Sequence, residues 1–366
     1  MYYGIHYLRG IAALMVVMHH CAKYLPESIR APIFGGAASG VDIFFMISGF
    51  IIVVATQKAE ANTTARFIGR RVFRIYPALA FCMLVGFATI YTDRSWLDIG
   101  RAIAPLPIDY TMNAPAFGYN LMGPAWTLTY EIMFYSFFCL AMSINHKHRA
   151  LIAALIMSIQ CFAIQTYFNG EFSFSAYTQL KTDGASPIYS YLKNASSPMF
   201  FEFIYGMLIA ELFLRYKHLI SKKIGWAALL FGSSVYLWLY ASQSTPGFGI
   251  TYFGMWSAFL FAGVCIYQAA NKTSRFAPLV FLGNISYSIY ISHYVVMGVV
   301  EKNNPLQFSS WGSLSQFAFV IFACIITGTF VHLVIEKPFI KIGKAITDPA
   351  VRPIPQARAE VTPQKR

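Results

Sequence analysis

Apolar stretches alternate with short polar segments along nearly the whole chain. At roughly 17–25 residues, each stretch is long enough for an α-helix to cross a hydrocarbon core of about 30 Å. The pattern predicts an all-α polytopic membrane protein of about ten transmembrane helices. The expected spans are residues 5–25, 40–56, 76–92, 126–144, 149–167, 198–215, 225–241, 250–269, 283–300 and 314–335.

The composition also indicates a lipid environment. Of the 366 residues, 57% are hydrophobic and only 12% are charged, and the mean hydropathy is +0.53. These values are too apolar for a soluble protein of this length. The first span contains Arg9, His19 and His20, and no small-residue cleavage site follows it. We therefore expect it to remain as a helix and not to be removed as a signal peptide.

The formal net charge of +13 does not indicate nucleic-acid binding, because the basic residues lie in short loops between apolar spans. Every second loop is rich in Lys and Arg. By the positive-inside rule, both termini are therefore expected in the cytoplasm. The opposite loops hold only seven of the 28 basic residues, namely Lys23, Arg30, Arg94, Arg101, Lys181, Lys193 and Lys302.

The spans divide the chain into two parts. Residues 1–345 are expected to form one transmembrane domain, and residues 346–366 a disordered cytoplasmic tail that is Pro-rich, polar and free of aromatic residues. We expect no second globular domain after the last helix. The six cysteines lie mostly inside spans without a C-x-x-C pair, so neither a disulfide framework nor a metal site is expected.

Ionisable side chains inside a membrane helix cost about 2.5–3.5 kcal/mol, so each is a candidate functional residue, with buried pairing for packing as the alternative. Arg9 and His20 lie in the first span with ten residues between them. Eleven helical steps return to within about 20° of the same face and rise roughly 16 Å, whereas His19 lies about 80° away. The spacing predicts a polar track from Arg9 near the cytoplasm to His20 in the outer half.

Two carboxylates are expected at a similar depth to His20. Asp42 begins the second span, and Glu131 lies early in the fourth. A carboxylate beside His20 would orient the imidazole and stabilise its protonated form, as a general base requires. Asp42 is the favoured partner because its span follows the first directly. For Glu131, a packing role against Tyr130 or Trp126 is an equal alternative.

A basic run, "RFIGRRVFRIYP", precedes the third span. Its spacing places Arg66, Arg70 and Arg74 on one helix face, with Arg71 beside them. Guanidinium groups bind phosphate through forked hydrogen bonds, so the run is a candidate site for a nucleotide-bearing donor. The alternative is that it only sets topology or contacts anionic lipid.

Three further polar residues are weaker candidates. His293 lies in the middle of the ninth span, where it either lines the same cavity or serves packing. His332 and Glu336 are spaced for an i,i+4 pair near the cytoplasmic edge.

In combination these segments resemble the membrane-bound acyltransferase 3 family, particularly its exopolysaccharide-production O-acetyltransferases. The resemblance covers most of the chain. It rests on Arg9 and His20 with their spacing, "GVDIFFMISGF" at 40–50, "RRVFRIYP" at 70–77, "AWTLTYEIMFY" at 125–135, "SYSIYISH" at 286–293 and "IEKP" at 335–338.

The resemblance implies O-acylation of a carbohydrate at the cell envelope, with acyl-coenzyme A, expected to be acetyl-coenzyme A, as the donor and no metal. The matching Arg9 and His20 would be the family's essential pair. It also implies a multi-pass protein of the bacterial inner membrane that works beside polysaccharide assembly machinery. Some relatives carry a soluble hydrolase-like domain after the helices, which is not expected here.

Both lines of reasoning lead to one expected mechanism. Arg70, Arg71 and Arg74 hold the phosphates of the coenzyme, and its pantetheine arm follows the track from Arg9 to His20. His20, oriented by Asp42, then deprotonates an acceptor hydroxyl. A covalent acyl-histidine remains an alternative. The competing functions are a transporter or flippase of a lipid-linked glycan, which would favour repeated halves and interrupted helices, and a non-catalytic assembly subunit.

Overall fold

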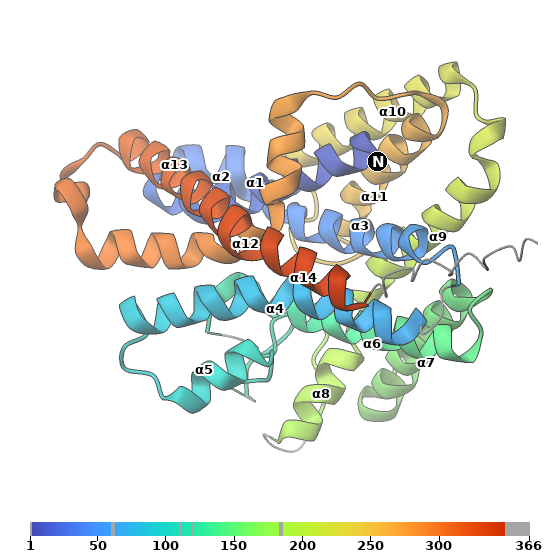
Figure 1. The fold of residues 1–366 in the computed structure, drawn as a ribbon, viewed down its shortest axis with the longest axis horizontal. Helices are drawn as coiled ribbons and strands as arrows, with labels where there is room; N and C mark the ends of the chain where they lie inside the picture. Colours follow the sequence, from blue (N-terminus) through green and yellow to red (C-terminus); the bar gives the residue numbers. More distant parts are fainter. Residues whose placement is uncertain (1, 60–62, 110, 119–120, 183–185, 348–366) are drawn as a thin grey trace, which may run out of the picture.

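The computed structural model describes residues 2–59, 63–109, 111–118, 121–182 and 186–347. Within these ranges the chain is helical and contains no β-strand (Figure 1). The predicted all-α class is therefore confirmed. Most of the tail expected to be disordered lies outside the described residues.

A helix occupies each of the predicted spans. These helices are α1 (Tyr3–Cys21), α3 (Gly40–Ala55), α4 (Thr63–Thr89), α6 (Trp126–Ile144), α7 (Arg149–Asn169), α9 (Phe200–Tyr216), α10 (Lys222–Ala241), α11 (Phe253–Ala270), α12 (Ala277–Asn303) and α13 (Ser313–Val331). Shorter helices lie between them or follow them: α2 (Glu27–Phe34), α5 (Trp96–Ile103), α8 (Pro187–Ala195) and α14 (Lys337–Thr347).

Not every helix in the described part of the chain is apolar enough to count as a membrane span. Eight helical segments are, or nine if the bent pair Pro187–Ala195 and Phe200–Leu219 forms one span. Helix α1 is not among them, since His6, Arg9, His19 and His20 lower its hydropathy. It lies instead inside the bundle, against α12 and α3.

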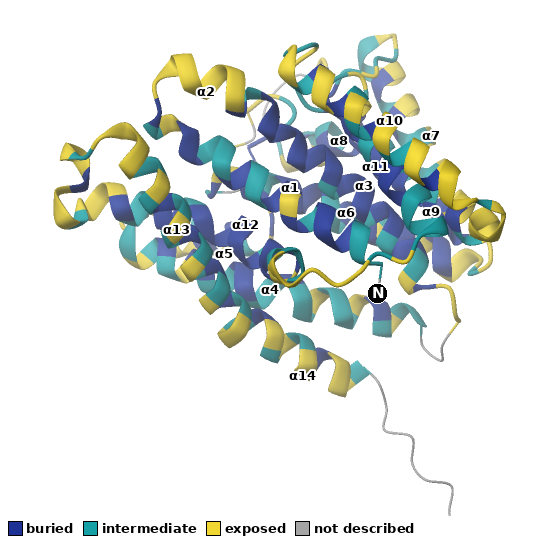
Figure 2. Cartoon of the chain, turned by 90° about the horizontal axis from the view of Figure 1, so that it is seen from above, coloured by how far each residue is buried: buried dark blue, intermediate teal, exposed yellow. Residues whose placement is uncertain are grey.

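Inner and outer helices differ in burial (Figure 2). The apolar window that contains α3 is 78% buried, whereas that of α10 is only 22% buried. The exposed side chains of α10 are large and apolar, among them Phe231 and Trp238, which are 63% and 70% exposed. A face of this kind requires lipid, so the burial pattern agrees with a membrane bundle.

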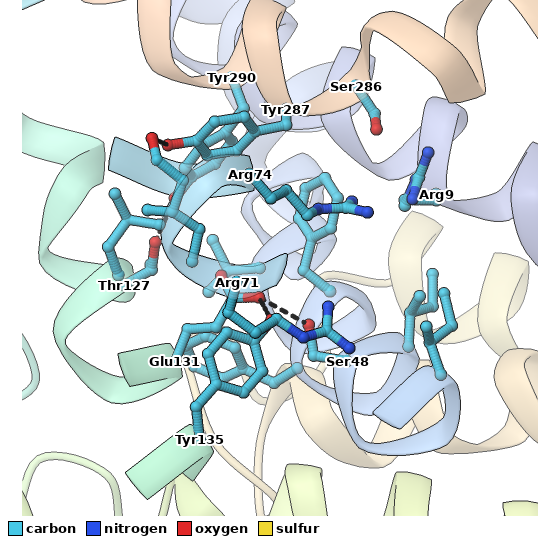
Figure 3. A pocket seen from close by; sticks show the side chains of 17 residues that line it. Arg9, Ser48, Arg71, Arg74, Thr127, Glu131, Tyr135, Ser286, Tyr287 and Tyr290 are labelled. Carbon is cyan, nitrogen blue, oxygen red and sulfur yellow. Dashed lines mark hydrogen bonds between the residues drawn. The ribbon is translucent and has the colours of Figure 1, made fainter. Parts of the chain in front are cut away.

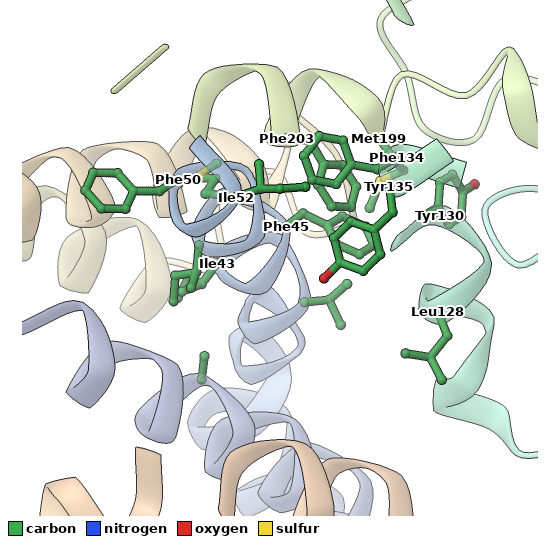
Figure 4. Close-up of a cluster of buried hydrophobic side chains, with 14 of the residues drawn as sticks. Ile43, Phe45, Phe50, Ile52, Leu128, Tyr130, Phe134, Tyr135, Met199 and Phe203 are labelled. Carbon is green, nitrogen blue, oxygen red and sulfur yellow. The ribbon is translucent and has the colours of Figure 1, made fainter. Parts of the chain in front are cut away.

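Aromatic side chains join α3, α6 and α9 at the centre of the bundle (Figure 4). The ring of Phe203 stacks on Phe45 and on Phe134, with centroids 4.5 Å and 4.4 Å apart. All three side chains are buried. This cluster fixes the position of α3 and α6, whose other faces line the candidate site.

Helices α1, α4 and α12 run in the same direction, towards the left of the view in Figure 1. Their C-terminal ends meet, because Lys302 Nζ donates to the Thr89 carbonyl at 2.7 Å and the Tyr24 hydroxyl donates to Glu301 Oε1 at 2.7 Å. At the opposite end, α14 packs along the first half of α4. Helix α4 starts well before the predicted span because its basic first turns extend the helix beyond the apolar stretch.

Candidate functional site

A pocket at the centre of the bundle is lined by five helices, α1, α3, α4, α6 and α12, and we call it the central pocket (Figure 3). It brings together four of the residues selected from the sequence: Arg9, Arg71, Arg74 and Glu131. Its remaining polar lining consists of Ser48, Thr127, Tyr135, Ser286, Tyr287 and Tyr290.

Arg9 is held at a close crossing of α1 and α12. A Cβ atom on Gly10 would lie 2.6 Å from the backbone nitrogen of Gly283, so only glycine allows this approach. As a result, an Arg9 NH2 group donates to the Gly283 carbonyl. The Nε atom of Arg9 is buried and has no hydrogen-bond partner within the described residues. The guanidinium therefore keeps a donor for a ligand.

The guanidinium of Arg74 points toward that of Arg9 across the pocket (Figure 3), and the two charges interact. Like charges repel in a site shielded from water, so an anionic or carbonyl-bearing ligand between them would be favoured. The arrangement suits the polar part of an acyl donor.

Glu131 lies on the opposite wall. Its Oε1 accepts hydrogen bonds from the Tyr135 hydroxyl and from Ser48 Oγ, the latter at 3.3 Å. Arg71 lies over the Tyr135 ring, 4.9 Å from its centroid. The hydroxyl of Tyr130 instead donates to the Pro115 carbonyl at 2.7 Å. Glu131 is thus fixed by residues of the pocket and not by the neighbours expected from the sequence.

A second pocket adjoins the central pocket and shares Ile51, Arg71 and Arg74 with it. We call it the basic mouth. It is the larger of the two, with a volume of about 270 Å³ against about 80 Å³. Its cations are Lys58, Arg70, Arg71, Arg74 and Lys344, and none of its described lining residues is acidic. Arg66 does not line it.

His20 is paired with His293. The Nδ1 atom of His20 lies 3.1 Å from Nε2 of His293, and Nδ1 of His293 lies 2.6 Å from the Tyr290 carbonyl oxygen. A carbonyl only accepts, so Nδ1 of His293 carries the proton and its Nε2 accepts from Nδ1 of His20. Nε2 of His20 is then left with a free lone pair, as a base or nucleophile requires.

Asp42 belongs to a different cluster. Its Oδ1 accepts from the Gly249 N–H at 2.9 Å, and its carboxyl faces the buried carboxyl of Glu202. Gly40 is the residue of α3 that faces α1, where its Cβ would lie 2.5 Å from the Ala12 carbonyl oxygen. Two residues further, the helix has turned by about 200°, which points Asp42 away from α1. The expected contact between Asp42 and His20 is therefore not formed.

Tyr290 connects the central pocket with the histidine pair. Its side chain lines the pocket, and its carbonyl holds His293. On the far side, His20 opens into a groove of about 550 Å³ where α1, α4 and α12 end, which we call the histidine groove. The predicted i,i+4 pair is confirmed separately, with His332 Nδ1 at 2.8 Å from Glu336 Oε2, which also accepts from Ser288.

Sequence reasoning missed three kinds of residue in this site. His293 is only a weaker candidate in the sequence, yet the structure places it against His20, and its position between Ser and Tyr residues in a membrane helix is a usable signal. Lys58 and Lys344 belong to the basic segments that the sequence explains by topology alone, yet both line the basic mouth. The phenol of Tyr135 lies one helical turn after Glu131, a spacing that marks it as a partner.

A family model described as "Acyltransferase domain" matches residues 2–333. The exopolysaccharide production protein ExoZ of Rhizobium meliloti is 24% identical across 84% of this chain and 91% of its own length. Nodulation protein 10 of Rhizobium leguminosarum bv. viciae is 25% identical across 79% of this chain and 81% of its own.

The O-acetyltransferase OatA of Staphylococcus aureus is 25% identical across 82% of this chain. The chain spans about half of that relative, 51% of its length. No solved structure matches the chain significantly.

Proposed function

This chain belongs to the acyltransferase 3 family of membrane-bound O-acyltransferases, and on that premise we propose that it transfers an acetyl group from acetyl-coenzyme A to a carbohydrate hydroxyl. The acceptor is an envelope or exported polysaccharide or its lipid-linked precursor. The observation that carries the proposal is that the basic mouth adjoins the central pocket, whose wall residue Tyr290 holds His293, the partner of His20, through its carbonyl.

The donor binds at the basic mouth. Lys58, Lys344 and the arginines at 70, 71 and 74 supply the charge that the phosphates of a coenzyme A molecule require. The thinner pantetheine arm then enters the narrower central pocket, where the buried Nε of Arg9 donates to one of its carbonyl groups. We place the mouth and both termini on the cytoplasmic side of a bacterial inner membrane, because coenzyme A is a cytoplasmic metabolite and the basic loops lie at that end.

The transfer takes place at His20. Its Nε2 removes the proton from the acceptor hydroxyl, and the oxygen attacks the thioester carbonyl. A C–O bond forms, the C–S bond breaks, and the proton passes from His20 to the departing thiolate. An acyl-histidine intermediate would use the same Nε2 atom. In this proposal His293, and not Asp42, orients the base, since it is the group that contacts His20.

The test compares the O-acetyl content of surface glycan in cells with equal amounts of wild type, His20→Ala and His19→Ala. His19 is a matched control because it adjoins His20 but bonds the Phe34 carbonyl at 2.9 Å. Loss of acetyl groups with His20→Ala alone is expected. Full acetylation with His20→Ala would overturn the proposal, and loss of the glycan itself from the surface would favour a transporter of lipid-linked glycan.

A further inference from the structure

The histidine groove lies at the opposite end of the bundle from the basic mouth. Helix α4 begins beside the mouth at Thr63, and residue Ile90, just after its last turn, lines the groove. The 27 residues of α4 rise about 40 Å, close to the thickness of a membrane. The two cavities therefore lie at opposite ends of the bundle, and His20 lines the groove.

We infer that the histidine groove is the acceptor site, and that it binds a pyranose unit of a carbohydrate chain whose hydroxyl is acylated. The inference rests on the proposed function. The central pocket does not offer an alternative, because it is the smaller cavity and its walls carry the arginines assigned to the donor. Two substrates that approach His20 from opposite ends can meet at one imidazole without sharing a channel.

Two tyrosines form the walls of the groove. The Tyr294 ring packs edge-on against His20 and His293, with centroids 5.0 Å and 5.2 Å away. Its hydroxyl lies beside Gly123 and makes no hydrogen bond with any described residue, so it is available to a ligand in the groove. Tyr91 faces the groove and is anchored through its hydroxyl to the Leu121 carbonyl at 3.3 Å. Aromatic rings offer a sugar an apolar face together with a polar edge.

The rim of the groove is charged and pre-oriented. Glu301 Oε1 forms an ion pair with Lys23 Nζ at 2.5 Å and accepts a hydrogen bond from the Tyr24 hydroxyl at 2.7 Å. Its second oxygen has no such partner among the residues that the structure describes and can accept from sugar hydroxyls. Lys302 is fixed by one bond to the Thr89 carbonyl and keeps further N–H groups. A carboxylate held in this way can accept hydrogen bonds from the hydroxyls of a pyranose. The neighbouring ammonium groups can donate to its adjacent hydroxyls and to its ring oxygen.

The groove contains more cations than anions, since Lys23 and Lys302 accompany a single Glu301. An acidic sugar is therefore tolerated as well as a neutral one. A free polymer and a lipid-linked precursor present the same pyranose chemistry, so the experiment must compare both sources.

The experiment measures ligand binding to the purified full chain in lipid nanodiscs by calorimetry. The probes are oligosaccharides of the producing organism's polysaccharide, freed of esters with mild base, and the lipid-linked glycan extracted from its membranes. Glu301→Gln and Tyr294→Phe are each expected to raise the Kd of the oligosaccharide about tenfold, with the Kd of acetyl-coenzyme A unchanged. Glu27→Gln, an exposed carboxyl on α2, is the matched control.

Unchanged oligosaccharide affinity in both variants would overturn the acceptor assignment, and so would an equal loss of acetyl-coenzyme A affinity. Binding of the lipid-linked glycan alone, again weakened by the variants, supports the site and identifies its source. The proposed function would be contradicted independently of the acceptor assignment if the wild-type protein binds the sugar but transfers no acetyl group to it.

Discussion

The Nδ1 atom of His20 on α1 lies 3.1 Å from Nε2 of His293 on α12, although 273 residues separate them. Because His293 is itself fixed by the Tyr290 carbonyl, the pair sets the tautomer of His20 and leaves its Nε2 unprotonated. A backbone carbonyl thus performs the orienting task that a carboxylate performs in many catalytic histidine pairs.

Removal of the orienting ring is expected to slow transfer. His293→Ala should lower kcat by about 10–100-fold and leave the Kd of acetyl-coenzyme A unchanged, because the ring does not line the donor path. His293→Gln should recover part of the rate, since its amide oxygen can accept from Nδ1 of His20. The kcat of purified variants and its pH profile provide the measurement. Equal rates in wild type and His293→Ala would contradict the pairing.

The basic mouth predicts a salt-dependent donor affinity in which α14 takes part. Lys344→Ala should raise the Kd of acetyl-coenzyme A several-fold, and the difference should shrink as salt is added, because the interaction is electrostatic. Lys341→Ala is the control, since Lys341 is exposed on the same helix but does not line the mouth. The Kd of radiolabelled acetyl-coenzyme A, measured for both variants over a range of salt concentrations, distinguishes the two lysines. A Kd that changes neither with salt nor with Lys344→Ala would favour a role in topology alone for the cations of the basic mouth.

The cluster around Asp42 predicts a structural role for that carboxyl. Asp42→Asn keeps an oxygen for the Gly249 N–H, so we expect activity within about threefold of wild type. Asp42→Leu removes that acceptor inside the bundle and should lower the thermal stability by several degrees. Activity and melting temperature are measured on the same preparations. A well-folded Asp42→Asn variant as inactive as His20→Ala would instead assign Asp42 to catalysis.

The crossing of α1 and α12 predicts a steric effect on Arg9. Gly10→Val should separate the two helices, weaken the Arg9 bond to the Gly283 carbonyl and reduce both melting temperature and donor affinity. Gly312→Ala is the control, because nothing lies within 4 Å of its Cβ position. Size-exclusion profiles after heating report the stability. A Gly10→Val protein as stable as wild type would show that the contact is not required.

Hydropathy located most of the long helices because lipid requires a long apolar stretch in each span, but it did not reveal the short helices or that α1 is too polar to count as a span. Helical periodicity also identified Arg9, His20 and the arginines at 70–74, since these relationships lie within single helices. The partner of His20 could not be derived in the same way. It depends on the rotation of α3 and α12 about their axes, which the Gly40 and Gly283 contacts determine. Lys344 reaches the mouth only through the packing of α14 on α4.

The most direct test of the central claim is vectorial transfer in proteoliposomes with the protein in one orientation. That orientation is read from a membrane-impermeant thiol reagent on Gln307→Cys, an exposed position in the segment after α12. With radiolabelled acetyl-coenzyme A on the side of the basic mouth and ester-free polysaccharide on the side of the histidine groove, label should reach the polysaccharide. It should not do so with His20→Ala. Equal labelling with His20→Ala, or labelling only when both substrates share one side, would contradict the account.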